Sequence, residues 1–158
     1  MKNSNLYSGE FACLEKANVD TDQIIPKQFL KSISKTGLGP YLFDAWRFLD
    51  EGFLGKKLSD RKINPDFILN NPSYLGINVL IADDNFGCGS SREHAVWALK
   101  DFGINVVVAP SFGDIFFNNC FKNGVLAIKI SQDQINEIFF QQNQNSQKQI
   151  EIDLINQK

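Results

Sequence analysis

The residues best suited to chemistry lie in one run, Asp84 to His94, which reads DNFGCGSSREH. The apolar run before it, residues 76–82, is typical of a buried strand, and the residues after it have a helical pattern. The run is therefore predicted at the carboxyl end of a strand, where open α/β sheets bind ligands. It also opens a helix, whose free N–H groups favour negative charge. An anion or a serine alkoxide would be stabilised there.

Ser90 has two interpretations. With Glu93 three residues later, it fits a capping box, which is a purely structural role. Three features favour chemistry instead. Two neighbouring glycines permit close backbone approach or a positive φ, and Ser91 adds a second hydroxyl. Arg92 places a cation in the first helical turn, where the helix dipole disfavours it, and this conflict predicts that Arg92 binds an anion such as a substrate carboxylate.

His94 and Cys88 are the other reactive side chains of the run. A Ser90–His94 nucleophile would lack an orienting acid, and its spacing departs from G-x-S-x-G, so we expect His94 to be a packed or supporting residue. Cys88 is either a thiolate activated by the helix N-terminus or a small packed residue, and the lack of a nearby second cysteine favours packing. The third glycine of a dinucleotide fingerprint is missing, which makes nucleotide binding the weakest hypothesis.

Composition predicts a single globular domain over residues 1–158. Hydrophobic residues make up 43% of the 158 residues, charged residues 22%, and the net charge is −2. No basic cluster predicts nucleic-acid binding, no apolar run is long enough for a membrane span, and no secretory signal is evident, so we expect a cytoplasmic protein. Three scattered cysteines and one histidine predict no metal site in this chain, so a metal would need ligands from another chain.

The pattern of elements predicts an α/β sheet with mostly parallel pairs. We expect strands over 9–19, 76–82, 104–109, 125–130 and 149–155, and helices over 26–32, 91–102, 112–122 and 131–141. The Gln- and Asn-rich residues 141–149 are predicted to form a solvated turn. Residues 33–73 are irregular and are predicted to form a long flexible loop that recognises substrate.

Three motifs carry a resemblance to a known family. Residues 85–95 (NFGCGSSREHA) resemble the signature of the swivelling domain of the aconitase superfamily, residues 18–26 (NVDTDQIIP) match its early element, and residues 107–124 match its later block. Together they resemble the small subunits of 3-isopropylmalate dehydratase over nearly the whole chain. The resemblance implies a three-layer swivelling β/α/β domain with a mixed, mostly parallel sheet flanked by helices.

The resemblance also implies a function. The family member works as a heterodimer whose large subunit carries a [4Fe–4S] cluster, and this chain would bind no cofactor itself. The reaction interconverts 2-isopropylmalate and 3-isopropylmalate through 2-isopropylmaleate in leucine biosynthesis. Ser90 would be the catalytic base, Ser91 and Arg92 would stabilise the alkoxide and bind a carboxylate, and Thr21 and Asp22 would support the site. From sequence alone, Asp22 fits an Asx-turn equally well.

The loop after residues 18–26 would recognise the side group of the substrate. Its candidates are Lys27, Tyr41, Phe43, Trp46 and Arg47. An apolar cluster suits an isopropyl group and Arg47 suits a carboxylate, but the aromatic residues fit an ordinary core or a subunit interface equally well.

Two alternatives remain open. The chain would serve a related hydro-lyase of the citramalate, homoaconitate or dimethylmalate type, or act as an unpaired ligand-binding domain. Relatives continue past the last strand with a further helical segment, whereas this chain stops at Lys158, so we expect this departure to affect docking of the large subunit.

Overall fold

A five-stranded sheet organises the chain. The computed structural model describes residues 6–145 and 148–153. The strands are β1 (Leu6–Leu14), β2 (Val79–Ala82), β3 (Val106–Ala109), β4 (Leu126–Lys129) and β5 (Gln149–Asp153), in the order β4-β3-β2-β1-β5. β1 to β4 are parallel and β5 pairs antiparallel with β1. The predicted α/β fold with a mixed, mostly parallel sheet flanked by helices is thus confirmed.

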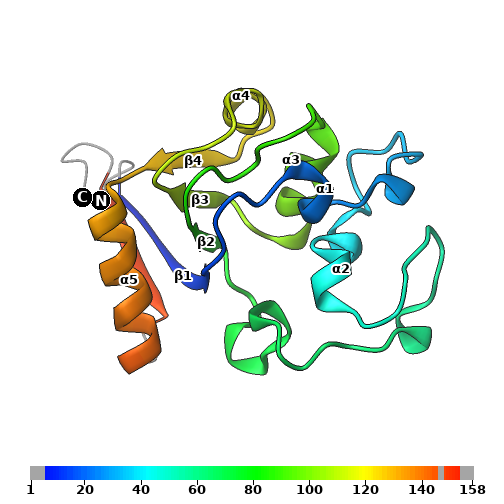
Figure 1. Ribbon diagram of the computed structural model, residues 1–158, viewed down its shortest axis with the longest axis horizontal. Helices are drawn as coiled ribbons and strands as arrows, with labels where there is room; N and C mark the ends of the chain where they lie inside the picture. Colours follow the sequence, from blue (N-terminus) through cyan, green and yellow to red (C-terminus); the bar gives the residue numbers. More distant parts are fainter. Residues whose placement is uncertain (1–5, 146–147, 154–158) are drawn as a thin grey trace.

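Helices lie on both faces of this sheet. The longer ones are α3 (Glu93–Phe102), α4 (Asp114–Lys122) and α5 (Gln132–Asn145), and the shorter ones are α1 (Thr21–Ile24) and α2 (Asp44–Arg47). Figure 1 shows α5 on one side of the sheet and α1 to α4 toward the other. Because side chains alternate along a strand, each face builds its own core: Ile135 and Phe139 of α5 pack on one, and α3 and α4 on the other.

The first strand ends earlier than predicted. β1 stops at Leu14 instead of residue 19, because the N–H of Lys16 turns back to the carbonyl of Leu14 at 2.8 Å and Asn18 adopts a φ of +57°. β2, β3 and β4 lie inside their predicted ranges. The predicted strand over 149–155 is described to Asp153, and its last two residues lie outside the described part of the chain.

Two helix predictions were wrong by more than two residues at one end. The helix expected over 26–32 is only a single 3-10 turn, η1 (Lys27–Phe29). α5 continues to Asn145, through residues that were expected to form a solvated turn. The reason lies in Gln142, which is buried and bonds to the backbone of β1: its Oε1 accepts from the N–H of Cys13 at 2.8 Å, and its Nε2 donates to the carbonyl of Phe11 at 3.1 Å.

The segment 33–73 packs on the face of the sheet that also carries α3 and α4. It contains α2 and short 3-10 turns, η2 (Gly39–Tyr41), η3 (Leu58–Asp60), η4 (Ile68–Asn70) and the start of η5 (Pro72–Tyr74). Leu38, Leu42, Phe43, Phe48, Phe67 and Leu69 from this segment are buried. Of the predicted recognition residues, Tyr41 stacks on Phe29 with ring centroids 4.2 Å apart and Trp46 stacks on Phe43 at 5.7 Å. These contacts match the core interpretation of the aromatic residues.

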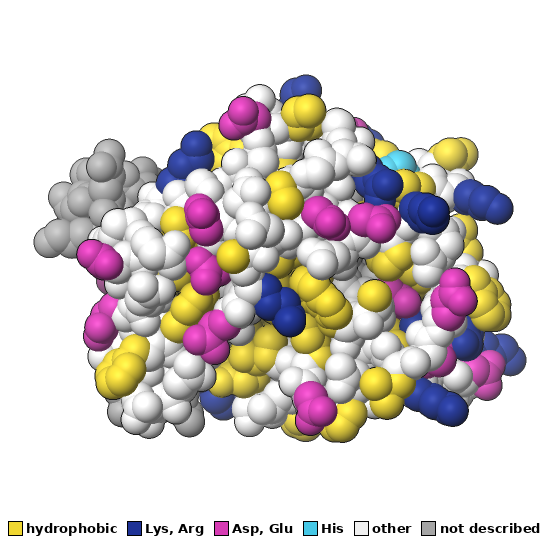
Figure 2. All heavy atoms as spheres, viewed as in Figure 1, with side chains coloured by type: hydrophobic (Ala, Val, Ile, Leu, Met, Phe, Trp, Pro, Cys, Tyr) yellow, Lys and Arg dark blue, Asp and Glu magenta, His cyan; other side chains and the backbone are white. Residues whose placement is uncertain are grey.

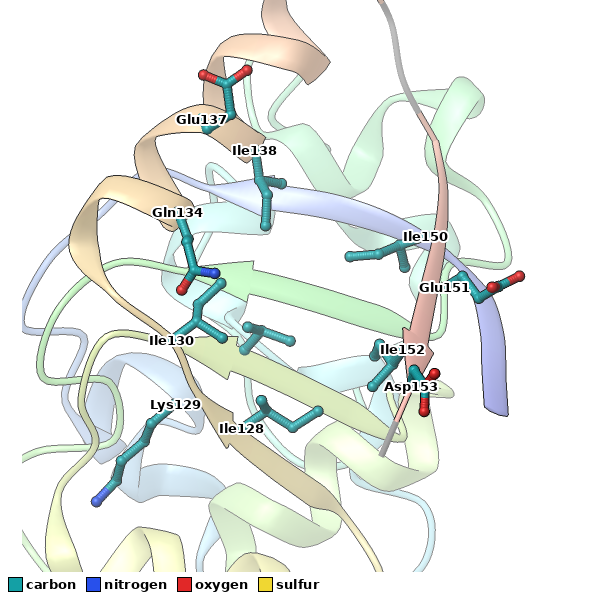
Figure 3. Close-up of a pocket in the computed structure, with 11 residues that line it drawn as sticks. Ile128, Lys129, Ile130, Gln134, Glu137, Ile138, Ile150, Glu151, Ile152 and Asp153 are labelled. Carbon is teal, nitrogen blue, oxygen red and sulfur yellow. The ribbon is translucent and has the colours of Figure 1, made fainter. Parts of the chain in front are cut away.

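An apolar groove of about 610 Å³ lies beside α5, on the other face. Figure 3 shows isoleucines directed into it from three elements: Ile128 from β4, Ile138 from α5, and Ile150 and Ile152 from β5. The charged ends of Glu137 and Glu151 point away from it. The groove has no residue in common with the serine run, so it is not where the predicted chemistry lies.

The charge pattern of the surface is mixed. Figure 2 shows acidic and basic side chains interspersed over the visible face, with no continuous basic strip across it. Within the described residues, no helix is both long enough and apolar enough to cross a membrane.

Candidate active site

The serine run lies where three loops meet. β1, β2 and β3 are parallel, so the loops that follow them emerge at one edge of the sheet. Two isolated bridges join these loops, Asp20 with Cys88 and Phe86 with Phe112. The run is therefore the middle loop of three, held by backbone bonds on both sides.

Glycines allow the loops to approach this closely. Gly87 has a φ of +79°, and a Cβ there would lie 2.2 Å from the ring of Phe116. A Cβ on Gly113 would lie 2.5 Å from the carbonyl oxygen of Gly87. Gly89 has a φ of +90°. The prediction of close approach and positive φ at the two glycines of the run is borne out by this geometry.

Ser90 does not cap the following helix. α3 begins at Glu93, two residues later than predicted, and its N-cap is Arg92 with extended backbone (φ −144°) and no side-chain cap bond. The capping-box interpretation of Ser90 is therefore wrong. The backbone of Ser90 is held instead by Thr21, whose Oγ1 donates to the Ser90 carbonyl at 2.7 Å. This leaves the exposed Ser90 hydroxyl free of a capping role.

A small hollow of about 220 Å³ opens beside Ser90. It is lined by Thr21, Gly87, Gly89, Ser90 and Arg92 from the first two loops, and by Gly113, Asp114, Ile115 and Phe116 from the start of α4. Like α3, α4 has no side-chain bond at its N-cap, Gly113. Backbone N–H groups at such helix ends favour an anion. A hollow this small holds only part of a metabolite-sized ligand, because complete sites usually span about 300–1,000 Å³.

Arg92 is held in place by a carboxylate. Its Nη1 donates to Oδ1 of Asp22 at 2.7 Å, and the exposed fractions of the two side chains are 19% and 57%. Asp22 therefore forms an ion pair with Arg92 across two loops, a contact that an Asx-turn alone would not predict. The N-cap of α1 is Asp20, in a capping box with Gln23.

Thr21 is the buried residue that joins α1 to the serine run. Its side chain is 2% exposed, and its N–H donates to the Cys88 carbonyl at 2.9 Å. Together with the Oγ1 bond to Ser90, this fixes two points of the run from one residue. Ser91 is exposed next to Ser90 and does not line the hollow.

The structure does not bring Arg47 and Lys27 to this hollow. Arg47 lies in α2 and lines a different hollow near the end of α3, together with Asp101 and Phe102. Lys27 is exposed on η1. Their predicted contact with substrate stays a prediction, and it needs a geometry other than the one seen here.

Sequence reasoning missed the start of α4 as a wall of the site. Gly113, Asp114, Ile115 and Phe116 follow β3 directly and line the hollow. A signal was present, because the turn at Pro110 and Gly113 comes right after an apolar strand, parallel to the strand before the serine run.

The remaining reactive residues of the run have packing roles. Nε2 of His94 lies 2.9 Å from the Ser32 carbonyl, and its ring packs on Trp97 with centroids 4.6 Å apart. Burial, and then the charge of Asp20, raises the pKa of the Cys88 thiol, which disfavours a thiolate. Both observations agree with the packing interpretations.

No cluster of metal ligands occurs in the described residues. They contain no group of three or more His, Cys, Asp and Glu side chains placed to hold a metal ion. Cys13 and Cys120 are buried, and burial raises the pKa of each thiol to about 12, with a further contribution from Glu15 at Cys13. These side chains do not fit the ligand set of an iron–sulfur cluster, which needs several convergent thiolates.

Comparisons with known proteins agree with the fold and with the three motifs. The family described as Aconitase C-terminal domain matches residues 1–133, a range that includes Thr21, Ser90 and Arg92. Among solved structures, the chain is similar to the crystal structure of 3-isopropylmalate dehydratase (leuD) from Methanocaldococcus jannaschii. The two are 29% identical with a TM-score of 0.62, and the match covers 96% of this chain and 72% of that chain. The predicted resemblance is confirmed, and this chain belongs to the aconitase C-terminal domain family.

Proposed function

We propose that this chain is the small subunit of a hydro-lyase that interconverts 2-isopropylmalate and 3-isopropylmalate through 2-isopropylmaleate. The name of the similar structure and the family membership support the reaction class. The observation that carries the proposal is the hollow at Ser90, where a free hydroxyl lies beside Arg92 and the uncapped start of α4.

In this proposal Ser90 is the catalytic base. Its Oγ takes the carbon-bound proton of the substrate, the electron pair forms the double bond, and hydroxide leaves from the neighbouring carbon. A serine hydroxyl is a poor base at neutral pH. Arg92 and the N–H groups at the start of α4 are suited to stabilise the alkoxide, because they carry positive charge. Arg92 and the residues at the start of α4 line the same hollow as Ser90.

The remaining roles follow from contacts. Arg92 lines the hollow and binds a substrate carboxylate, because its guanidinium offers a planar fork of donors. Ser91 is exposed outside the hollow, and its role in carboxylate binding rests on the family resemblance alone. Asp22 holds Arg92 at 2.7 Å, and Thr21 positions Ser90 through its carbonyl. Thr21 and Asp22 are therefore positioning residues, because they act through their neighbours.

The proposal requires a second chain to complete the site. The hollow holds only part of a diacid, Ser90 is exposed, and the apolar side chain of Ile115 on its rim is 53% exposed. The large subunit covers this face and carries the [4Fe–4S] cluster, which supplies a Lewis acid to the departing hydroxide.

The test combines the purified chain with its large subunit. Isomerase activity is expected only when both are present. Ser90→Ala is expected to lower kcat by about 10²–10⁴-fold, the range for loss of a general base, without loss of the complex. Ser73→Ala changes an exposed serine on η5 and serves as the matched control.

Two results would contradict the proposal. A near-normal kcat in Ser90→Ala would show that Ser90 is not the catalytic base. A higher kcat/KM for citramalate, homoaconitate or dimethylmalate than for isopropylmalate would keep the chemistry and change the substrate.

A further inference from the structure

A second hollow lies at the opposite end of α3 from Ser90. Its volume is about 520 Å³, within the usual range for small-molecule sites. Tyr41, Arg47, Leu58, Asp101 and Phe102 are among the residues that line it. Arg92 precedes α3 and Phe102 ends it, so a ten-residue helix of about 15 Å separates the two hollows.

Among the described residues, Arg47 is a largely buried cation without a carboxylate partner. Its Nη1 donates to three backbone carbonyls, those of Gly39 (3.4 Å), Pro40 (3.1 Å) and Leu42 (3.2 Å). Its Nε is buried and has no hydrogen-bond partner in the part of the chain that the structure describes. Within residues 6–145 and 148–153, the recorded ion pairs engage Lys56, Arg61 and Arg92 but not Arg47.

The neighbouring Arg61 shows what Arg47 is missing. Arg61 binds both oxygens of Asp44 at 2.8 and 3.0 Å, and its Nε donates to Asp50 at 2.8 Å. Besides the three backbone carbonyls, the guanidinium of Arg47 contacts two aromatic rings, with Cζ 5.1 Å from the ring centroid of Phe48 and 5.0 Å from that of Phe102. Cation–π contacts offset only part of the lost hydration of a buried charge.

Burial lowers the pKa of Arg47, and the nearby positive charge of Arg61 adds to this, although Asp44 opposes it. The protonated guanidinium is therefore less favourable here than in water. An anion in the hollow would restore the missing interaction and would be bound by a charge already held in place.

We propose that this hollow binds a small monocarboxylate with an apolar body. The carboxylate would bind the guanidinium of Arg47, which suits its planar geometry. Tyr41, Leu58 and Phe102 would contact the apolar body.

Asp101 argues against a ligand with more negative charge. It lines the same hollow, and its Oδ2 accepts from the N–H groups of Gly37 (3.1 Å) and Gly39 (2.8 Å). A second carboxylate or a phosphate dianion would meet this charge, while the other two cations that line the hollow, Lys56 and Arg61, are already paired with Asp50 and Asp44. The site therefore differs in ligand class from the diacid site proposed at Ser90, and it stands independently of that proposal.

The probe is sodium 4-methylpentanoate, titrated into the full chain and followed by amide chemical shifts at constant ionic strength. Saturable shifts are expected at Gly39 and Phe102, with Ser90 unaffected. Arg47→Gln is expected to weaken binding by about 10- to 100-fold, which corresponds to one charged hydrogen bond. Arg92→Gln, at the other end of α3, is the matched control and is expected to leave the Kd unchanged.

The wild-type titration keeps the test valid if Arg47→Gln fails to fold. Absence of saturable shifts, shifts centred on Ser90 to Arg92, or equal binding of inorganic phosphate would each overturn the proposal. An unchanged Kd in a folded Arg47→Gln variant would do the same.

Discussion

Gly87 shows how strictly a single residue governs the geometry of the site. It lies where the serine loop contacts α4, with a φ of +79°. Any Cβ there would lie 2.2 Å from Phe116, a ring that also lines the hollow. A larger residue would therefore move the wall of the site as well as strain the backbone.

Gly87→Ala separates steric clash from backbone strain when it is compared with Gly55→Ala. Both glycines have positive φ, +79° and +87°, but Gly55 has no atom within 4 Å of its Cβ position. Gly55→Ala is expected to lower the free energy of unfolding by about 1–2 kcal/mol, the strain of a left-handed residue. Gly87→Ala should lose a further ~1–3 kcal/mol from overpacking. Urea unfolding measures both, and equal losses would contradict the close approach.

At the scale of elements, α3 and the segment 33–73 hold two separate hollows in place, one at Ser90 and one at Arg47. α3 begins beside Ser90 and ends at the Arg47 hollow, so one rigid helix holds both at a constant separation. The segment is fastened by ion pairs, of which Arg61 with Asp44 is buried, both side chains being 3% exposed. Removing one member of such a pair leaves an uncompensated charge.

Asp50 makes the stability contributed by these ion pairs dependent on pH. Its carboxylate accepts bonds from Lys56 Nζ, from the N–H of Lys62 and from Arg61, which together hold its pKa well below the usual range. A folded-state pKa below the unfolded value of about 3.9 gives stability that is fully present above that value and is lost as the pH falls through the folded pKa.

Asp50→Asn should therefore lower Tm near neutral pH and flatten the fall of Tm on acidification below about pH 4. Thermal unfolding across this range measures it. Asp66→Asn, at an exposed aspartate outside these ion pairs, is the control and should keep the wild-type acid dependence.

At the scale of the whole molecule, the faces of the sheet differ in what they expose. The Ser90 hollow, with Ile115 among its lining residues, lies at the carboxyl edge of the parallel strands. The apolar groove lies on the face of the sheet that α5 covers. Under the proposed function, the large subunit covers the Ser90 hollow. The exposed apolar residues at that edge should then matter for assembly more than those on α5.

Ile115→Asp is expected to weaken the complex with the large subunit by about 10-fold or more, because it places a charge in an apolar contact. The Tm of the isolated chain should stay nearly constant, since Ile115 is 53% exposed. Phe140→Asp on α5, at 55% exposure, is a closely matched control that should leave the Kd unchanged. Equal effects of the two substitutions on the Kd, measured by interferometry, would place the interface elsewhere.

Local chemistry made much of the fold predictable. The apolar runs that became β2, β3 and β4 are short and bounded by turn residues, and Gly103 ends α3 with a φ of +113°, as its position indicated. Predictions were wrong where a distant partner decides the outcome. Gln142 extends α5 by bonding to β1, and Thr21 holds the Ser90 carbonyl across 69 residues of sequence, so a capping box that looked favourable did not form.

The sequence by itself determined the alternation of strands and helices, the glycines that allow close approach, and the position of the serine run after a buried strand. These depend on residues near in sequence, whose dihedral preferences and hydrophobic periods act locally. Only the tertiary structure decided that Asp22 holds Arg92, that the start of α4 walls the site, and that Arg47 lies at the far end of α3. Those facts depend on how parallel strands bring separate loops to one edge, and on burial and pairing of charge, which local pattern does not specify.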